Sequence, residues 1–352
     1  MKLSVIIPFY NEEQQIAHTL DVVRNVLQSY IAQQKDVGYN EDTHGATGVC
    51  CGTGAGDAGD RAHEEAGRCA RSRVIRAFEM VLVDDGSTDA TWEKIEQAAA
   101  QDSCIIGISF SRNFGKEAAL CAGLDAVTGD AVVLLDGDLQ HPPEVIPEML
   151  ELWRDGYEVV EGVKASRGKE SLAHRLSAKL FYSIFYRASG FNLGDASDFK
   201  LLDRKVVEAW KALGEKDTFF RGLSCWLGFK RTQVSFDVQA RETGSSKWSF
   251  LRLLKLSLHA ITGFSAAPLY IIVVIGLILE VCFLVLGLQT IVNWLTGQAA
   301  SGFTTVILLQ LLIGGSILLS LGLIGLYLAR IFVEVKDRPR YIVSRRTDGN
   351  MP

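Results

Sequence analysis

The sequence has no basic excess. Its 352 residues include 36 Lys and Arg against 41 Asp and Glu, a formal net charge of −5. A protein that binds nucleic acid neutralises phosphates with a basic surplus, so this composition argues against a nucleic-acid partner. With 48% hydrophobic and 22% charged residues, the chain is too apolar for disorder and too charged to consist of membrane spans throughout. Anion binding must therefore be local.

A disulfide framework is also missing. The seven cysteines are odd in number and scattered, and Cys50, Cys51, His63 and Cys69 match no usual zinc spacing. The apolar stretch that precedes Pro8 is too short, and becomes polar too soon, for a secretory signal peptide. We expect a cytosolic catalytic part with reduced thiols.

Long hydrophobic runs are confined to the carboxy-terminal third. Residues 268–290 contain one charge, Glu280, and residues 304–329 contain none. Both runs exceed the roughly 20 apolar residues that cross a bilayer. Residues 330–346 carry six basic and two acidic side chains, so the positive-inside rule places both ends of this hairpin in the cytoplasm.

Three weaker features accompany these spans. Residues 250–264 place leucines on one helical face and Arg252, Lys255 and His259 on the other, which favours a helix in the membrane interface or one packed on the soluble domain. A carboxylate at the position of Glu280 is expected to be functional or paired. Small residues such as Gly314 and Gly315 favour a homo-oligomer through the spans.

Residues 1–240 alternate short β-branched runs with helical stretches, which predicts a parallel α/β sheet. The expected strands are residues 3–7, 79–83, 105–110, 131–135 and 159–163. Residues 35–76 are rich in small residues and lack periodicity, so we expect a mobile insertion there.

Polar clusters follow three of these strands, at residues 8–12, 84–89 and 136–140. Ligands of such sheets lie beyond the carboxyl ends of the strands. Asp136 and Asp138, one residue apart, can direct oxygens to one point and suit a hard cation, Mg²⁺ or Mn²⁺, which would in turn hold a diphosphate.

These clusters carry a resemblance. Residues 5–12, 83–87 and 136–143 resemble the inverting GT-A glycosyltransferases of family 2. Residues 111–116, 198–204, 221–223 and 244–248, with the two spans, resemble its polyprenyl-phosphate branch, which includes dolichol-phosphate mannose synthase and bacterial undecaprenyl-phosphate glucosyltransferases. The resemblance covers nearly the whole chain apart from the insertion.

The resemblance implies a fold and a domain order. The fold is GT-A (Rossmann-like), α/β, a mixed and mainly parallel sheet with helices on both faces. The domains are a cytosolic catalytic domain at 1–240, a juxtamembrane segment at 241–266, a transmembrane hairpin at 267–330 and a basic cytosolic tail at 331–352. The implied location is the bacterial inner membrane.

The resemblance also implies site residues. Pro8, Tyr10, Glu12, Asp85, Asp136 and Lys247 would bind the nucleotide sugar, and Asp136, Asp138 and Gln140 the metal and diphosphate. Asp138, Asp198 and Arg221 would be catalytic, with Arg241 also near the phosphates. Ser197 stands where the family usually has glycine. Lys164, Arg175 and Lys179 match the positions that bind the acceptor phosphate, and they concentrate positive charge on an otherwise acidic protein.

The implied reaction is a metal-dependent, single-displacement transfer of one hexose from a nucleotide diphosphate sugar to polyprenyl (undecaprenyl or dolichyl) phosphate. The acceptor phosphate is already ionised, so Asp198 is expected to orient groups rather than to act as a base. The carboxy-terminal half is most similar to the glucosyl branch, which favours UDP-glucose; GDP-mannose, UDP-N-acetylglucosamine and UDP-aminoarabinose stay open. The alternative from another class is a non-catalytic membrane subunit or lipid-carrier translocator that retains a nucleotide-sugar-binding domain.

Overall fold

The computed structural model describes residues 1–36, 73–164, 183, 185–187, 190, 197–216, 219–236, 262–296 and 302–349. The chain divides into two compact units. The sheet unit comprises Met1–His174, Leu193–Ser246 and Pro339–Pro352, and the helical unit comprises Arg175–Asn192 and Lys247–Arg338. Most of the expected insertion and of the expected interfacial helix lie outside the described residues.

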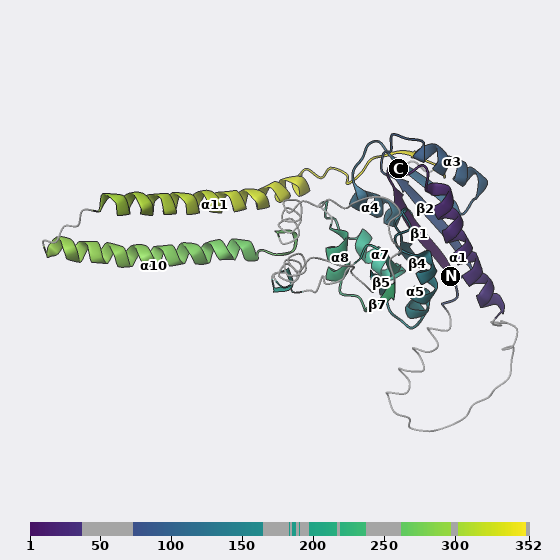
Figure 1. Ribbon diagram of the computed structural model, residues 1–352, viewed down its shortest axis with the longest axis horizontal. Coiled ribbons are helices and arrows are strands. Elements are labelled where there is room, and N and C mark those ends of the chain that lie inside the picture. Colours follow the sequence, from purple (N-terminus) through teal and green to yellow (C-terminus); the bar gives the residue numbers. More distant parts are fainter. Residues whose placement is uncertain are drawn as a thin grey trace, which may run out of the picture. The chain divides into compact units, whose positions relative to one another are not determined.

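The sheet unit is built on one eight-stranded sheet of order β7-β5-β6-β4-β1-β2-β3-β8 (Figure 1). Its strands are β1 (Lys2–Phe9), β2 (Ala77–Asp84), β3 (Ile105–Phe110), β4 (Ala131–Leu134), β5 (Val159–Lys164), β6 (Lys200–Asp203), β7 (Arg231–Phe236) and β8 (Val343–Arg346). Only β6 and β8 run against the other strands. The expectation of a mixed, mainly parallel sheet is confirmed.

Both faces of the central strands are buried, which is why their sequences are almost continuously apolar. Along β1, Val5 and Ile7 pack into the core shared with the first group of helices, whereas Ile6 meets Gly123 of the second group. The first group is α1 (Ile16–Asp36), α3 (Thr91–Gln101), the 3-10 turn η2 (Pro143–Val145) and α5 (Ile146–Arg154). The second is α4 (Lys116–Ala126) and α7 (Arg204–Lys211). A short helix, α8 (Phe220–Trp226), follows α7.

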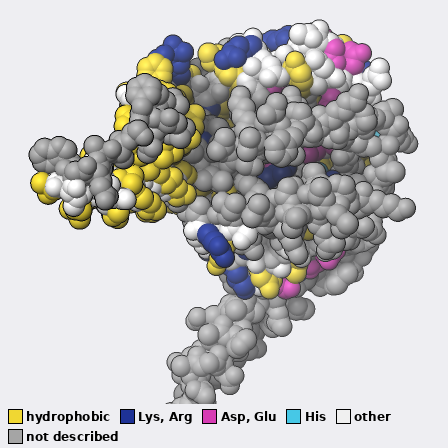
Figure 2. Space-filling view, turned by 60° about the vertical axis from the view of Figure 1, so that its left-hand side comes forward, with side chains coloured by type: hydrophobic (Ala, Val, Ile, Leu, Met, Phe, Trp, Pro, Cys, Tyr) yellow, Lys and Arg dark blue, Asp and Glu magenta, His cyan; other side chains and the backbone are white. Residues whose placement is uncertain are grey.

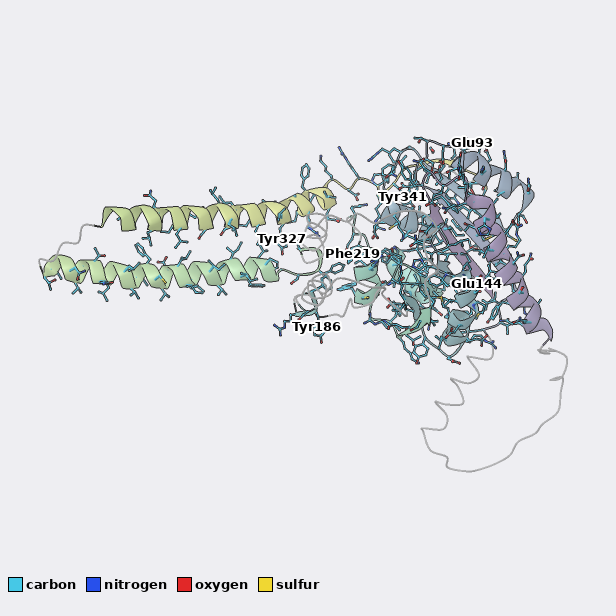
Figure 3. The ribbon with its side chains drawn as sticks, in the orientation of Figure 1. Glu93, Glu144, Tyr186, Phe219, Tyr327 and Tyr341 are labelled. Atoms are coloured by element: carbon cyan, nitrogen blue, oxygen red, sulfur yellow. The ribbon has the colours of Figure 1, made fainter. Side chains whose placement is uncertain are left out.

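The carboxy-terminal tail returns to the sheet, which the sequence did not indicate. β8 pairs antiparallel with β3, with Val343 opposite Phe110. Tyr341, labelled in Figure 3, stacks on Phe110 with ring centroids 5.0 Å apart and donates a hydrogen bond to Asp125 Oδ2 at 2.7 Å. The tail therefore covers a strand edge that would otherwise expose unpaired backbone groups.

The helical unit contains α10 (Ala267–Leu295) and α11 (Phe303–Val335), which run side by side in opposite directions (Figure 1). Pro268–Asn293 and Leu312–Val335 are long and apolar enough to cross a membrane, and none of their most apolar stretch is buried. Hydrophobic side chains cover their surface (Figure 2). Tyr327 of α11 donates a hydrogen bond to the Ser265 carbonyl at 2.7 Å, which ties α11 to the residues just before α10.

We predict that Tyr341→Ala loosens β8 without unfolding the sheet. The variant loses the ring stack and the hydrogen bond to Asp125, and we expect amide hydrogen exchange in residues 343–346 to accelerate at least about tenfold. Tyr270→Ala, on an exposed position of α10, is the matched control. Unchanged protection of residues 343–346 in the Tyr341 variant would contradict this account of the tail.

Candidate active site

A cavity of about 340 Å³ lies at the carboxyl ends of the central parallel strands. Its lining combines carboxylates, one ammonium group and an exposed aromatic ring. The lining residues are Pro8, Phe9, Tyr10, Glu12, Asp85, Asn113, Gly115, Lys116, Ala119, Asp136, Gly137 and Asp138. These residues end β1 or follow β1, β2, β3 and β4, so the sheet topology alone brings four separate sequence segments to one site.

The loops around the cavity are tied to one another by side-chain hydrogen bonds. Ser87 Oγ accepts from the Asn11 amide at 2.9 Å, and Asn11 Oδ1 accepts from the Thr88 amide at 2.9 Å. Gly86 has φ +68°, and a Cβ there would lie 2.3 Å from the Arg112 carbonyl carbon. Only glycine fits this position, because the backbone is left-handed and the next loop presses against it.

Asp85 fixes the loop that precedes α4. Its Oδ1 accepts from the Phe114 amide at 2.7 Å and its Oδ2 from the Gly115 amide at 2.9 Å. Burial raises the pKa of Asp85, and the two amides partly oppose that shift. Gly115 has φ +98° and caps α4 without a side chain, so Asp85 supplies the hydrogen bonds that set the start of this helix.

Lys116, the first residue of α4, joins two carboxylates from different segments. Its Nζ lies 2.6 Å from Asp136 Oδ1 and 3.0 Å from Asp198 Oδ2. Burial alone would lower the pKa of Lys116, but the charges of Asp136 and Asp198 outweigh it and raise that pKa. A fixed positive charge therefore stands at the centre of the site.

Asp198 is also held by Arg221 of α8. Arg221 Nε donates to Asp198 Oδ1 at 2.7 Å and Arg221 Nη2 donates to Oδ2 at 2.8 Å, a two-point pair. Burial opposes ionisation of Asp198, but the hydrogen bonds and charge of Arg221, with those of Lys116, hold its pKa well below the usual range. Asp198 is thus ionised and a poor proton acceptor near pH 7.

Negative charge exceeds positive charge on the other wall of the cavity. Burial, followed by the charges of Asp138 and Asp136, raises the pKa of Glu12 to about 7. Asp138 Oδ1 accepts from the Gln140 amide at 3.1 Å, which closes a tight turn. His141 Nδ1 is buried without a hydrogen-bond partner, 3.5 Å from Asp136 Oδ2. Within the described residues, no three His, Cys, Asp or Glu side chains are grouped as metal ligands.

The cavity brings together Pro8, Tyr10, Glu12, Asp85, Asp136 and Asp138, all singled out from the sequence, and Asp198 and Arg221 connect to it through Lys116. Gln140 stands two residues beyond Asp138, and Lys164 is the exposed last residue of β5. Arg175, Lys179, Arg241 and Lys247 lie outside the described residues.

Sequence reasoning did not single out Lys116 or Glu117. Both belong to the polar run that follows β3, one further strand end at the edge of the sheet. Their place just after a predicted strand was therefore the sequence signal that could have identified Lys116 and Glu117 as site residues. Burial raises the pKa of Glu117 to about 7, and the charge of Asp198 adds to that shift.

The fold and site are those of an α/β enzyme with a charged cavity at the strand ends. Comparison with known proteins identifies its family. Residues 68–210 match the family model "Glycosyl transferase family 2". The uncharacterized glycosyltransferase YkcC of Bacillus subtilis is 40% identical over 270 residues, 76% of this chain and 84% of that protein. The chain belongs to glycosyl transferase family 2 and is a glycosyltransferase.

Two further proteins are similar to this chain. The SfII prophage-derived bactoprenol glucosyl transferase of Shigella flexneri is 37% identical over 274 residues, 77% of this chain and 89% of that protein. The glucosyl-3-phosphoglycerate synthase of Mycobacterium tuberculosis, solved with Mn²⁺ and UDP, is 18% identical with a TM-score of 0.38, covering 74% of this chain and 76% of that one. The resemblance to family 2 seen in the sequence is confirmed.

We predict that Asp85→Ala lowers the stability of the sheet unit. The variant leaves the Phe114 and Gly115 amides without an acceptor. A buried amide that loses its acceptor costs about 1–3 kcal/mol of stability. The melting temperature in detergent should fall by several degrees. Asp85→Asn keeps one acceptor oxygen and should lose less, and Asp155→Ala, at the exposed end of α5, should lose nothing. Equal melting temperatures for all three would contradict the proposed anchoring.

Proposed function

We propose that this glycosyltransferase moves a single hexose, glucose from UDP-glucose, to a polyprenyl phosphate at the cytoplasmic face of a membrane. The observation that supports this proposal most directly is the pair of ion pairs made by Lys116. They place one fixed cation in the cavity, between the Asp136 and Asp198 carboxylates. An anionic donor needs such cations where its phosphates bind. The name of the Shigella flexneri relative supports both the sugar and the lipid class.

The donor would bind in the cavity with its base beside the loop after β1. Tyr10 is 46% exposed there, which leaves an aromatic face for stacking against a nucleotide base. Pro8 forms the adjacent wall. Lys116 would contact the diphosphate, because it is the cationic side chain that lines this cavity among the described residues.

The carboxylates of the cavity are of the chemical type that would bind a divalent cation, although no three of them are grouped as ligands among the described residues. Glu12, Asp136 and Asp138 would offer hard oxygen ligands. Burial and then the charges of Asp138 and Asp136 raise the pKa of Glu12 to about 7, and a bound cation would reduce the repulsion among these carboxylates. Asp136 and Asp138, with the side-chain carboxamide oxygen of Gln140, would hold Mg²⁺ or Mn²⁺. When bound, that ion neutralises charge on the departing nucleoside diphosphate.

The chain's own residues would position the reactants rather than exchange protons. Asp198 is ionised and held by Arg221 and Lys116, so it would orient these two cations toward the phosphates. The acceptor phosphate oxygen is already ionised near pH 7 and can attack the anomeric carbon without a base. One displacement breaks the bond to the diphosphate oxygen, forms the bond to the acceptor oxygen and inverts the anomeric centre.

The acceptor would reach the site from the membrane surface. Lys164, exposed at the carboxyl end of β5, and Arg175 and Lys179 form a basic segment suited to the lipid phosphate. The chain returns from α11 to pair β8 with β3 in the sheet unit. Because the chain leaves this unit before α10 and re-enters it after α11, two crossings would bring both ends back to the side where transfer occurs.

We predict that Asp138→Ala abolishes transfer to lipid. Purified protein, Mn²⁺ and undecaprenyl phosphate are incubated with labelled UDP-glucose, GDP-mannose, UDP-N-acetylglucosamine and UDP-aminoarabinose. The wild type should label the lipid with glucose, and Asp138→Ala should reduce labelling at least about a hundredfold.

Mn²⁺ alone should raise the melting temperature of the wild type but not of this variant, since only a bound ion stabilises the folded state. Asp155→Ala is the control for both readouts. Full labelling by Asp138→Ala removes the cation assignment, and labelling from none of the four donors removes the proposed function.

We also predict a topology in which the connection between α10 and α11 is extracytoplasmic. In a variant whose seven cysteines are replaced by serine, Thr296→Cys should react with a membrane-impermeant maleimide on intact cells. Lys336→Cys should react only after the cells are opened, because the basic segment stays inside. The reverse pattern would contradict the cytoplasmic placement.

A further inference from the structure

The helix that carries Arg221 does not provide its own amino-terminal cap. α8 spans seven residues, and its N-cap residue is Phe219, labelled in Figure 3, whose side chain makes no cap hydrogen bond. A helix this short gains little from its internal hydrogen bonds, and its first amides need outside acceptors. Its orientation must therefore come from contacts with other elements.

Glu117 supplies the missing acceptor. Its Oε2 accepts a hydrogen bond from the Phe220 backbone amide at 2.8 Å. Glu117 is the second residue of α4 and stands 103 residues from Phe220 in the sequence. A carboxylate at the first amide of a helix meets both the unpaired N–H and the positive end of the helix dipole.

The far side of α8 is anchored by a buried charge. Lys200 of β6 is fully buried, pairs with Glu161 of β5 at 2.8 Å and donates to Ser224 Oγ. Ser224 Oγ in turn donates to the Arg221 carbonyl at 3.0 Å. The helix is thus held from two directions, at its first amide by Glu117 and near its middle by Lys200.

These contacts lead directly to the reacting groups. Arg221 follows Phe220 and forms the two-point pair with Asp198. Lys116 precedes Glu117 and binds the same carboxylate. Of two adjacent residues of α4, Lys116 therefore contacts Asp198, and Glu117 fixes the helix whose Arg221 contacts the same carboxylate.

We propose that Glu117 is a positioning residue of the transfer reaction, which caps α8 from a distance and so holds the Arg221 guanidinium against Asp198 and toward the donor diphosphate. The proposal rests on the function given above, because it assigns Glu117 a role through Arg221. It requires the acceptor oxygen of residue 117 rather than its charge.

The test compares Glu117→Ala with Glu117→Gln. Loss of the cap should lower kcat of Glu117→Ala by about ten- to a hundredfold while KM for the nucleotide sugar changes less than about threefold. Glu117→Gln keeps an oxygen that accepts from Phe220 and should retain kcat within about fivefold of the wild type. Glu93→Ala, an exposed acidic residue in the first turn of α3 (Figure 3), should match the wild type.

A double-mutant cycle tests whether Glu117 acts on the reaction through Arg221. If Glu117 acts through Arg221, Glu117→Ala should lower kcat less than about threefold in an Arg221→Ala background. Additive losses, or equal losses in the Ala and Gln variants, overturn the proposal.

Hydrogen exchange separates this proposal from the proposed function. The Phe220 and Arg221 amides should exchange at least about tenfold faster in Glu117→Ala and at the wild-type rate in Glu117→Gln. Unchanged exchange in Glu117→Ala overturns the cap whatever the activity. A wild type that glycosylates no polyprenyl phosphate refutes the function, while the exchange result still decides whether Glu117 caps α8.

Discussion

The site depends on one cation that belongs to the protein itself. Arg221 also pairs with Asp198, but Lys116 is the cation that joins the carboxylates of Asp136 and Asp198. The ammonium group joins the loop after β4 to the segment before β6, and these two segments are far apart in the sequence. Because the pair interactions outweigh the cost of burying Lys116, the charge is present before any substrate arrives. A preorganised charge is what stabilises a departing diphosphate most effectively.

A small number of polar contacts also fixes the elements around the site. Asp85 sets the start of α4 through two amides, and Thr19 of α1 donates to the Gly137 carbonyl between the paired aspartates. Deeper in the unit, Lys200 and Glu161 form an ion pair from which water is almost excluded. Buried pairs of this kind contribute little net stability compared with apolar residues of the same volume. Here the pair fixes geometry, because Lys200 donates to Ser224 Oγ, which in turn donates to the Arg221 carbonyl.

The sequence was sufficient for the parts that depend on local pattern. Runs of β-branched residues predicted β1 to β5, since strands buried on both faces are continuously apolar, and the polar residues after β1, β2 and β4 predicted the cavity. It was insufficient where partners are far apart. β8 reads as a basic tail because two of its four residues are arginines, and only pairing with β3 makes it a strand. Lys116 and Glu117 resemble any helix start until Asp198 and Phe220, about a hundred residues later, are placed beside them.

The tail after α11 ends at the sheet edge that carries the cavity. Val343 pairs with Phe110, the last residue of β3, so β8 enters the sheet at the carboxyl edge, where the cavity lies. Only residues 336–342 separate the end of α11 from that strand. Arg340 fastens this short connection by donating to the Leu213 and Glu215 carbonyls at 2.7 Å. The backbone pairing of β8 with β3 and the two Arg340 hydrogen bonds therefore hold the tail on the sheet unit, at the sheet edge that carries the cavity.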